Sequence, residues 1–210
     1  GGYINRSQII KFTWDKEEYS GYSGDTLASA LMANNINVIG RSFKYHRPRG
    51  ISSAGVEESG ALVTIGSGSN TDANVRATTA ELFHGLVAHG QNAWPNVRFD
   101  LGAINNLLSP FFAAGFYYKT FMGHRPFNPK NGTRSWMLYE KFIRKAAGMG
   151  KASNLPDPDK YEHAHMHCDI LIVGSGPSGR AAAIEAAGAG CDTVLIEQDF
   201  LLGGNTLNLK

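Results

Sequence analysis

Short β-prone runs alternate with polar turns in the first third of the chain. Ile9–Trp14 and Glu18–Tyr22 are rich in β-branched and aromatic residues and flank a polar turn, which predicts two neighbouring strands. Ile36–Ile39 and Ala61–Ile65 have the same character and predict two further strands. This segment is therefore expected to form a small sheet.

A helix is predicted between the second and third of these runs. Apolar residues recur there at spacings i, i+1, i+4 and i+5 and form one stripe, made up of Leu27, Ala28, Leu31 and Met32. Asp25 is expected to cap this helix, and Asn34-Asn35 to end it. The order of elements predicts an α+β module, in which a helix packs on a small mixed sheet in a β-grasp-like layout.

The pattern is less regular between residues 67 and 168. Several X-Pro steps interrupt any long helix there, and short helices are predicted at Thr79–Ala88, Ala103–Leu108 and Trp136–Ala147. Leu155–Asp159 is typical of a linker. We therefore expect a β-grasp-like module at 1–70, an irregular helical connecting region at 71–160 and a last unit at 161–210.

The last unit has the pattern that opens a Rossmann-like dinucleotide-binding domain of the α/β class. Asp169–Val173 is an apolar run typical of a buried parallel strand, and Gly174–Gly179 follows it with the spacing GxGxxG. Ala181–Ala189 predicts a helix, and Thr193–Ile196 a second strand that Glu197 ends. The whole order is more specific than a glycine-rich turn alone, which remains the alternative interpretation.

Each part of this motif has a physical role in holding a nucleotide. Gly174 permits the tight turn, Gly176 lets the backbone approach a pyrophosphate, and Gly179 lets the helix lie close to the strand. The free N–H groups at the start of the helix then face the phosphates. The predicted cofactor-binding residues are Gly174, Ser175, Gly176, Pro177, Ser178, Gly179, Glu197, Gln198, Gly203 and Gly204.

Glu197 narrows the choice of nucleotide. A carboxylate at this position accepts hydrogen bonds from both ribose hydroxyls and repels a 2′-phosphate, which disfavours NADP. The pair Gly203-Gly204 is typical of flavoproteins with two dinucleotide sites, so the motif leaves both NAD and FAD open. Arg180, unusual at the start of this helix, either points to solvent or reaches a phosphate.

Composition excludes several classes of function. The 210 residues carry a formal charge of only +2, too balanced for an extended nucleic-acid footprint. The sequence contains neither an apolar run long enough to span a membrane nor a secretory signal, so we expect a cytoplasmic protein. Cys168 and Cys191 are the only cysteines, which excludes a disulfide framework and a four-cysteine metal site.

One βαβ unit is not a complete dinucleotide-binding domain, so we expect the chain to be a fragment of a longer one.

Three clusters have two interpretations each. The basic residues of Arg41–Gly50, namely Lys44, His46, Arg47 and Arg49, suit either a solvated, packed loop or an interface or phosphate contact. His163, His165, His167 and Cys168 form a possible but disfavoured metal site, since surface histidines are commoner. Phe111-Phe112 and Phe116–Tyr118 are expected in a core or subunit contact rather than in a cofactor pocket.

Several motifs in register give the chain a resemblance to a known family. It resembles the alpha subunits of heterotetrameric sarcosine oxidases, in their N-terminal portion, at Gly24–Leu31, Gly40–Gly50, Asn92–Pro95, Leu108–Phe111, Gly115–Phe121 and His165–Asp169. The first module also resembles the ferredoxin-like β-grasp module. Its cluster-binding loop has no cysteine here, so a cluster and electron transfer through it are excluded.

The resemblance implies an enzyme that oxidatively demethylates sarcosine to glycine, with tetrahydrofolate taking the one-carbon unit and oxygen the electrons. It implies NAD on the Rossmann-like domain of this chain, with FAD as the alternative. The beta subunit would carry FAD and a covalently attached FMN, the FMN near the alpha–beta interface, and gamma and delta subunits would complete the complex. The folate-binding domain would lie far downstream.

No amine-oxidising site is visible in these residues, so no catalytic and no metal-ligating residue is assigned. Two other functions remain open. One is a FAD-binding subunit of a related amino-acid-oxidising complex of the opine oxidase or hydrogen cyanide synthase type. The other is a non-catalytic subunit that holds a nucleotide for assembly.

Overall fold

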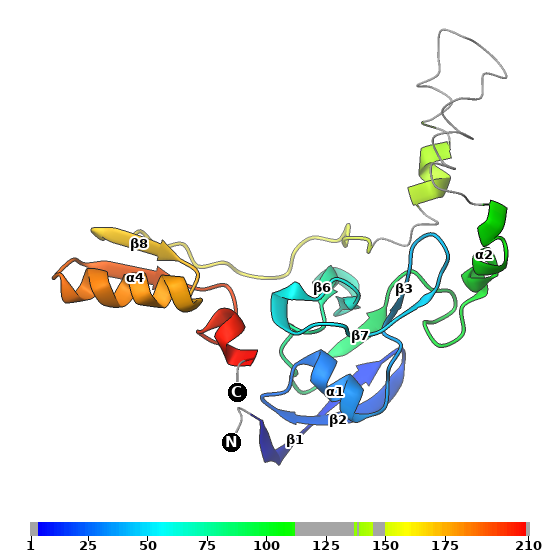
Figure 1. The fold of residues 1–210 in the computed structure, drawn as a ribbon, viewed down its shortest axis with the longest axis horizontal. Helices are drawn as coiled ribbons and strands as arrows, with labels where there is room; N and C mark the ends of the chain where they lie inside the picture. Colours follow the sequence, from blue (N-terminus) through cyan, green and yellow to red (C-terminus); the bar gives the residue numbers. More distant parts are fainter. Residues whose placement is uncertain (1–3, 112–136, 138, 145–149, 209–210) are drawn as a thin grey trace, which may run out of the picture.

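The computed structural model describes residues 4–111, 137, 139–144 and 150–208 (Figure 1). Two structured parts stand out in the ribbon, a sheet-containing N-terminal module in blue to green and a βαβ unit in orange. The module is α+β and the unit is α/β, as the sequence pattern indicates.

A β-hairpin opens the N-terminal module and forms one edge of its sheet. The strands β1 (Asn5–Trp14) and β2 (Glu17–Ser23) pair antiparallel, which confirms the predicted pair. Asp15 and Lys16 connect them with φ of 47° and 76°, the double left-handed conformation that suits the twist of a two-residue hairpin.

The sheet has five strands in the order β2-β1-β7-β5-β6. The inner strand β7 runs parallel to β1 and antiparallel to β5, which itself pairs antiparallel with β6. The remaining strands of this sheet are β5 (Leu62–Ile65), β6 (Asp72–Arg76) and β7 (Val87–Gly90). The sheet of the first module thus takes in strands beyond residue 70.

The helix α1 (Leu27–Ala33) packs its apolar face into the core beside the sheet. Leu27 and Leu31 are fully buried there with Phe12 of β1 and Val63 of β5. The helix ends at Asn34 as predicted, but the expected cap was wrong by one residue. Thr26 is the N-cap, because its side chain accepts a hydrogen bond from Ser29 N at 3.2 Å.

Asp25 has another role at the start of α1. Its Oδ2 accepts from Tyr22 N at 2.9 Å and its Oδ1 accepts from Ser29 Oγ at 2.6 Å. The carboxylate therefore joins the end of β2 to the first turn of the helix, which is the reason it is buried although it does not cap.

Two predicted elements of this module were wrong. Residues 36–39 form no strand, because this segment, in which only Ile39 is fully buried, makes isolated backbone hydrogen bonds such as Ile39 N to Arg49 O at 2.8 Å. A short ladder begins directly after this segment, between β3 (Gly40–Arg41) and β4 (Pro48–Arg49). The predicted helix Thr79–Ala88 is also absent, since turns up to Gly85, whose φ is 82°, lead into the inner strand β7.

Short helices and extended segments make up the rest of the described residues before the last unit. The predicted helix Ala103–Leu108 is confirmed, with α2 at Ile104–Leu107. Of the predicted helix Trp136–Ala147, residues 137 and 139–144 are helical and the others lie outside the described residues. Residues 150–168 contain no helix or strand, in agreement with the predicted linker. Single-turn 3-10 helices lie at η1 (Gly55–Glu57), η2 (Gly68–Asn70), η3 (Leu101–Ala103) and η4 (Ser109–Phe111).

The last unit is a parallel βαβ arrangement. Its elements are β8 (Ile170–Val173), α4 (Pro177–Gly188) and β9 (Thr193–Ile196), followed by the 3-10 helix η6 (Gly204–Asn208). The strands pair in parallel from Ile170 with Thr193 to Val173 with Ile196. Val173 is 77% exposed and Ile184 of α4 is 68% exposed, so the described residues leave much of this unit's apolar surface uncovered. Among them, no helix is long and apolar enough to cross a membrane.

Candidate dinucleotide site

The turn between β8 and α4 is built around two glycines that no other residue could replace without strain. Gly174 has a φ of 96°, in the left-handed region that disfavours side chains. A Cβ on Gly179 would collide with the carbonyl oxygen of Gly174. The backbone of the turn therefore lies directly against the first turn of α4, as the spacing predicts.

Gly176 is a glycine for another reason. Its φ of −60° and ψ of 177° are open to any residue, and a Cβ there would meet no atom within 4 Å. Neither the fold nor the backbone of the described residues requires glycine at this position. Open space therefore lies beside Gly176, and in dinucleotide sites with this spacing the second glycine lets the backbone approach a pyrophosphate.

The start of α4 offers donors for such an anion. Gly176 is the N-cap, and no side chain caps the helix. Pro177 at the first helical position has no N–H, so the N–H groups of Ser178 and Gly179 are the donors of the first turn. With the positive end of the helix dipole, they form a surface suited to phosphate.

The Glu197 carboxylate, at the end of β9, organises the turn. Its Oε2 accepts from Ser175 N at 2.7 Å and from Ser175 Oγ at 2.6 Å. Its Oε1 accepts from Gln198 N at 2.8 Å and from Asp199 N at 3.1 Å. Hydrogen bonds from the side chain and the backbone of Ser175, followed by those of Asp199 and Gln198, lower the pKa of Glu197 to about 2.

The glycine pair after β9 closes the site. Gly203 N donates to Ser175 Oγ at 3.0 Å, and a Cβ on Gly204 would lie 3.2 Å from Gly176 Cα. Hydrogen bonds thus join Glu197 and Gly203 to Ser175, which is fully buried, and the other predicted cofactor-binding residues lie beside these three in the chain. Sequence reasoning listed Ser175 without a role and missed Asp199. Arg180 is exposed, in agreement with its solvent-facing interpretation.

The basic loop Arg41–Gly50 packs against the segment after β7. Arg41 Nε donates to Val97 O at 2.9 Å, and Arg47 Nε donates to Asn106 Oδ1 at 2.8 Å. His46 Nδ1 lies 2.7 Å from Asp100 Oδ2, and both side chains are largely buried. Lys44 and Arg47 lie over the ring of Tyr45. These contacts favour the packing interpretation of the loop.

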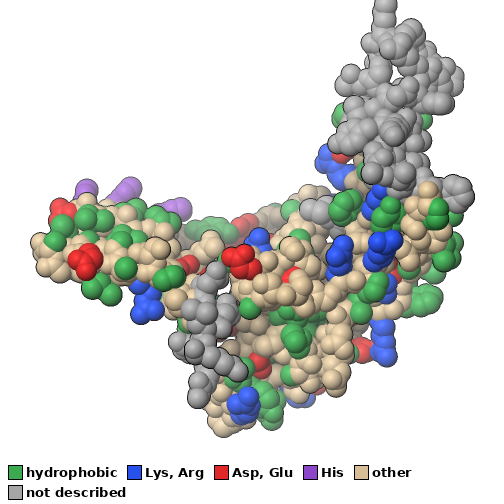
Figure 2. Space-filling model, in the orientation of Figure 1, with side chains coloured by type: hydrophobic (Ala, Val, Ile, Leu, Met, Phe, Trp, Pro, Cys, Tyr) green, Lys and Arg blue, Asp and Glu red, His purple; other side chains and the backbone are tan. Residues whose placement is uncertain are grey.

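Other candidate residues do not converge on the site. His163, His165 and His167 are exposed, and Figure 2 shows histidines gathered along the C-terminal unit. The part of the chain that the structure describes contains no group of three or more His, Cys, Asp or Glu side chains placed to hold a metal ion. The aromatic residues 112 and 116–118 lie outside the described residues, as does the side chain of Phe111.

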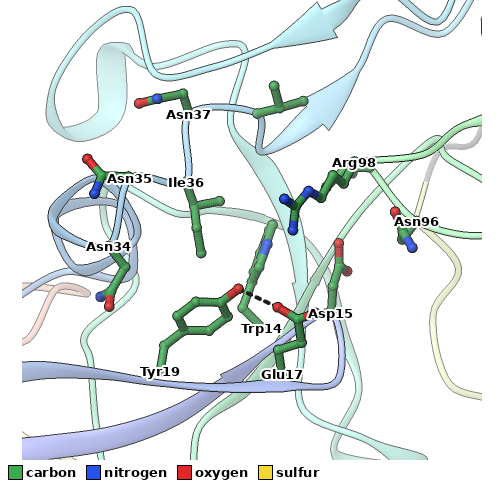
Figure 3. Close-up of a pocket in the computed structure, with 12 residues that line it drawn as sticks. Trp14, Asp15, Glu17, Tyr19, Asn34, Asn35, Ile36, Asn37, Asn96 and Arg98 are labelled. Carbon is green, nitrogen blue, oxygen red and sulfur yellow. Dashed lines mark hydrogen bonds between the residues drawn. The ribbon is translucent and has the colours of Figure 1, made fainter.

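A cavity of about 530 Å³ lies in the N-terminal module, far in sequence from the glycine turn (Figure 3). Tyr19 and Arg98 point into it, and Tyr19 Oη donates to Glu17 Oε2 at 2.6 Å. Asp15 also lines it, and burial raises the pKa of that carboxyl. None of the predicted cofactor-binding residues lines this cavity.

Glu58, beside η1, has a carboxylate that is buried without any partner side chain of opposite charge among the described ion pairs. Its Oε2 accepts from Ser52 N at 2.6 Å and from Ser53 N at 2.7 Å, and its Oε1 accepts from Gly60 N. The loop from residue 52 to 60 is therefore closed around one carboxylate.

Comparison with known protein families gives one match for each structured part. Residues 7–93 match the 2Fe-2S iron-sulfur cluster binding domain, and residues 169–208 match the FAD dependent oxidoreductase family. The first match agrees with the β-grasp-like layout of the module. The second covers all ten predicted cofactor-binding residues and supports the involvement of a flavin enzyme.

The residues of the first module do not fit a [2Fe–2S] cluster. Such a cluster needs thiolate ligands, and the sequence has no cysteine between residues 7 and 93. The ligand spacing C-x4-C-x2-C fits the loop before β5 at Ser53, Glu58 and Ala61. In this chain the Glu58 carboxylate takes up the backbone N–H groups of that loop.

Three relatives that align with nearly the whole chain have the same name, sarcosine oxidase subunit alpha. Sarcosine oxidase subunit alpha of Rhizobium meliloti is 52% identical over 99% of this chain and 20% of its own length. The protein of the same name from Corynebacterium sp. strain U-96 is 32% identical over 97% of this chain and 16% of its own. The chain thus spans about a fifth or less of the length of these relatives. L-proline dehydrogenase from P. horikoshii aligns with 17% identity and a TM-score of 0.47, over 96% of this chain and 27% of that one.

Proposed function

Because the chain is a homologue of the N-terminal portion of sarcosine oxidase subunit alpha, we propose that it belongs to the alpha subunit of a sarcosine-oxidase-type oxidoreductase and holds NAD at residues 169–204. The observation that supports the nucleotide site is the space at Gly176. That glycine is required by no contact of the described fold, and it lies at the uncapped start of α4.

The residues of the turn have distinct tasks in this proposal. The N–H groups of Ser178 and Gly179 bind the pyrophosphate, and Gly176 lets it approach the backbone. Glu197 and Gln198 lie where the adenosine ribose would be held. Since Ser175, Gln198 and Asp199 already donate to both oxygens of Glu197, a ribose hydroxyl would share an oxygen with one of them. A bound dinucleotide would supply two-electron redox chemistry, while this chain contributes binding and orientation.

The rest of the assignment follows from the relatives and concerns the whole enzyme. We propose that the complete cytoplasmic complex demethylates sarcosine to glycine with tetrahydrofolate and oxygen, and contains beta, gamma and delta subunits. FAD and FMN would belong to the beta subunit, with FMN near the alpha–beta interface. The amine-oxidising site would then lie outside this chain, and we assign no catalytic residue to it.

FAD is a second candidate for the nucleotide of this chain. The family that residues 169–208 match is described as FAD dependent, and both FAD and NAD contain the ADP group that the turn would hold. Extraction of the purified complex, and of its separated alpha chain, followed by mass spectrometry decides between them. Recovery of FAD and no NAD from the alpha chain would overturn the choice of NAD, and recovery of neither would overturn the site.

A pair of glycine variants tests the turn itself. Gly176→Ala should leave the fold unchanged, but its methyl group would clash with a pyrophosphate and lower dinucleotide affinity by about tenfold or more, which corresponds to at least about 1.4 kcal/mol. Gly188→Ala, at the other end of α4, is the control, since a Cβ there also meets no atom within 4 Å. Equal affinity in both variants contradicts the proposed position of the pyrophosphate.

A further inference from the structure

A cleft separates the N-terminal module from the glycine turn of the C-terminal unit. It encloses about 610 Å³, within the range of cavities that hold small molecules and cofactors. Gly176, Pro177 and Gly204 form part of one wall, and Val56, Thr78 and Thr79 of the N-terminal module form part of the other. The cleft thus begins at the phosphate-binding end of α4 and is completed by a different part of the chain.

The position of the cleft relative to Glu197 limits what can fill it. The Glu197 carboxylate is turned toward Ser175 and does not line the cleft, whereas Gly176 and Pro177 do. A dinucleotide consists of two nucleotides joined at the pyrophosphate. With the adenosine ribose at Glu197 and the pyrophosphate at Gly176, the cleft is the described space that remains for the other half of the molecule.

The chemistry of the walls suits that half. Phe200, Leu201 and Leu207 contribute apolar surface from the C-terminal unit, and Val56, 44% exposed, faces the same space from the module. Thr78 and Thr79 bring hydroxyl groups to the module side. A flavin or nicotinamide ring presents flat apolar faces, and the sugar or ribitol that carries it presents hydroxyls, so both kinds of surface have a partner.

The module wall is held in place by hydrogen bonds within the module. Thr78 Oγ1 donates to Gly55 O at 2.7 Å, and the Glu58 carboxylate holds the amides of Ser52 and Ser53 on the preceding stretch of the loop. The 3-10 helix η1, which carries Val56, contacts η6 of the C-terminal unit. A wall fixed by contacts of its own loses little conformational entropy when a ligand binds.

We propose that this cleft receives the half of the dinucleotide beyond the pyrophosphate, so that the cluster-free N-terminal module forms the second wall of the nucleotide site. The proposal rests on the proposed function, since it takes the pyrophosphate position from it. The module that the matched family uses to carry an iron–sulfur cluster would here contribute a surface for the redox half of the cofactor.

The test compares two probes on the nucleotide-stripped complex, ADP and the whole dinucleotide, the latter as NAD and in a parallel series as FAD. Val56→Trp fills the cleft from the module side and should weaken the dinucleotide that binds by tenfold or more, while ADP affinity stays within twofold. Val87→Trp is the matched control, because Val87 is 38% exposed on β7 and does not line the cleft. It should change neither affinity.

A second variant with a smaller side chain tests the same position in case Val56→Trp does not fold. Val56→Ala removes apolar contact without adding bulk, and should weaken the dinucleotide severalfold with ADP affinity unchanged. If the wild-type complex binds neither probe, the proposed function fails and the inference fails with it. If the wild type binds both probes, and the Val56 variants weaken both equally or neither, the nucleotide site stands and the role of the cleft is refuted.

Discussion

Glu58 provides the sharpest test of how the N-terminal module is held together. Glu58→Gln keeps the size of the side chain, which is 1% exposed, and removes its charge. Oε2 accepts hydrogen bonds from the backbone N–H groups of Ser52 and Ser53, and Oε1 accepts one from that of Gly60. In either orientation of the glutamine amide, its NH2 group therefore faces at least one of these donors.

The cost follows from these contacts. A hydrogen bond to a charged acceptor contributes roughly 1.5–3 kcal/mol, and a buried donor left unpaired costs about 1–3 kcal/mol. The variant loses the charge on every bond and leaves one donor or two unpaired. We therefore expect the loop to be destabilised by about 3–5 kcal/mol, a large part of the stability of an ordinary domain.

Hydrogen exchange followed by mass spectrometry measures the opening of this loop in the full complex. Peptides that cover residues 50–62 should exchange at least about 100-fold faster in Glu58→Gln, since each 1.4 kcal/mol corresponds to a factor of ten. Glu81→Gln is the matched control, because Glu81 is an exposed glutamate of the same module and the same substitution there should alter exchange of these peptides by about twofold or less. A change below threefold in Glu58→Gln refutes the reasoning that the carboxylate organises the loop.

The pH dependence gives an independent check on Glu58. Burial alone would raise the pKa of this carboxyl, but hydrogen bonds from Ser53, Gly60 and Ser52 outweigh it and hold the pKa below its usual 4.5. A lowered pKa in the folded state stabilises the fold above the unfolded pKa and loses that effect as the pH falls through the folded value. The difference between wild type and Glu58→Gln should stay constant from pH 8 to about 5 and shrink in stronger acid.

Three further predictions concern single positions. Thr26→Ala removes the N-cap of α1 and should lower the free energy of unfolding by about 1 kcal/mol in urea titrations, whereas Thr26→Ser should change it little. Gly179→Ala forces a Cβ against the Gly174 carbonyl, so dinucleotide retention measured after gel filtration should be lost. The Glu197 carboxyl should titrate near pH 2 by carbon NMR, and Ser175→Ala should move that midpoint upward, because the Ser175 hydroxyl donates to the ionised form.

The elements that sequence pattern predicted correctly depend on contacts between near neighbours. The β1–β2 pair is joined by a two-residue turn, and β8, the glycine turn and β9 follow one another within 30 residues. In such segments, alternation, turn residues and glycine spacing all describe the same local geometry. The strand–turn–helix–strand order around the candidate nucleotide site was predictable for the same reason, whereas its ten cofactor-binding residues stay a prediction.

The errors fall where distant segments decide the structure. The segment Thr79–Ala88 has spacings compatible with a helix, yet Leu82 and Leu86 are buried as it enters β7, which pairs with β5 and with the much earlier strand β1. Ile36–Ile39 is apolar because Ile39 fills the core, and not because it forms a ladder. The hydrophobic pattern of the sequence predicts that such residues are buried, but it does not predict which segments pack against them.

The glycine turn depends on contacts between near neighbours in the chain, whereas the cleft beside it depends on contacts between distant segments. Glu197, Ser175 and Gly203 fix the turn through hydrogen bonds inside the βαβ unit, so the geometry of the proposed phosphate site is set within that unit. The cleft, in contrast, lies between the two parts of the chain, where η1 contacts η6, about 150 residues away in the sequence. ADP affinity should therefore depend on the unit alone, and affinity for the rest of the dinucleotide on both parts of the chain. The ratio of the two affinities is the quantity that reports on how the module and the unit are joined.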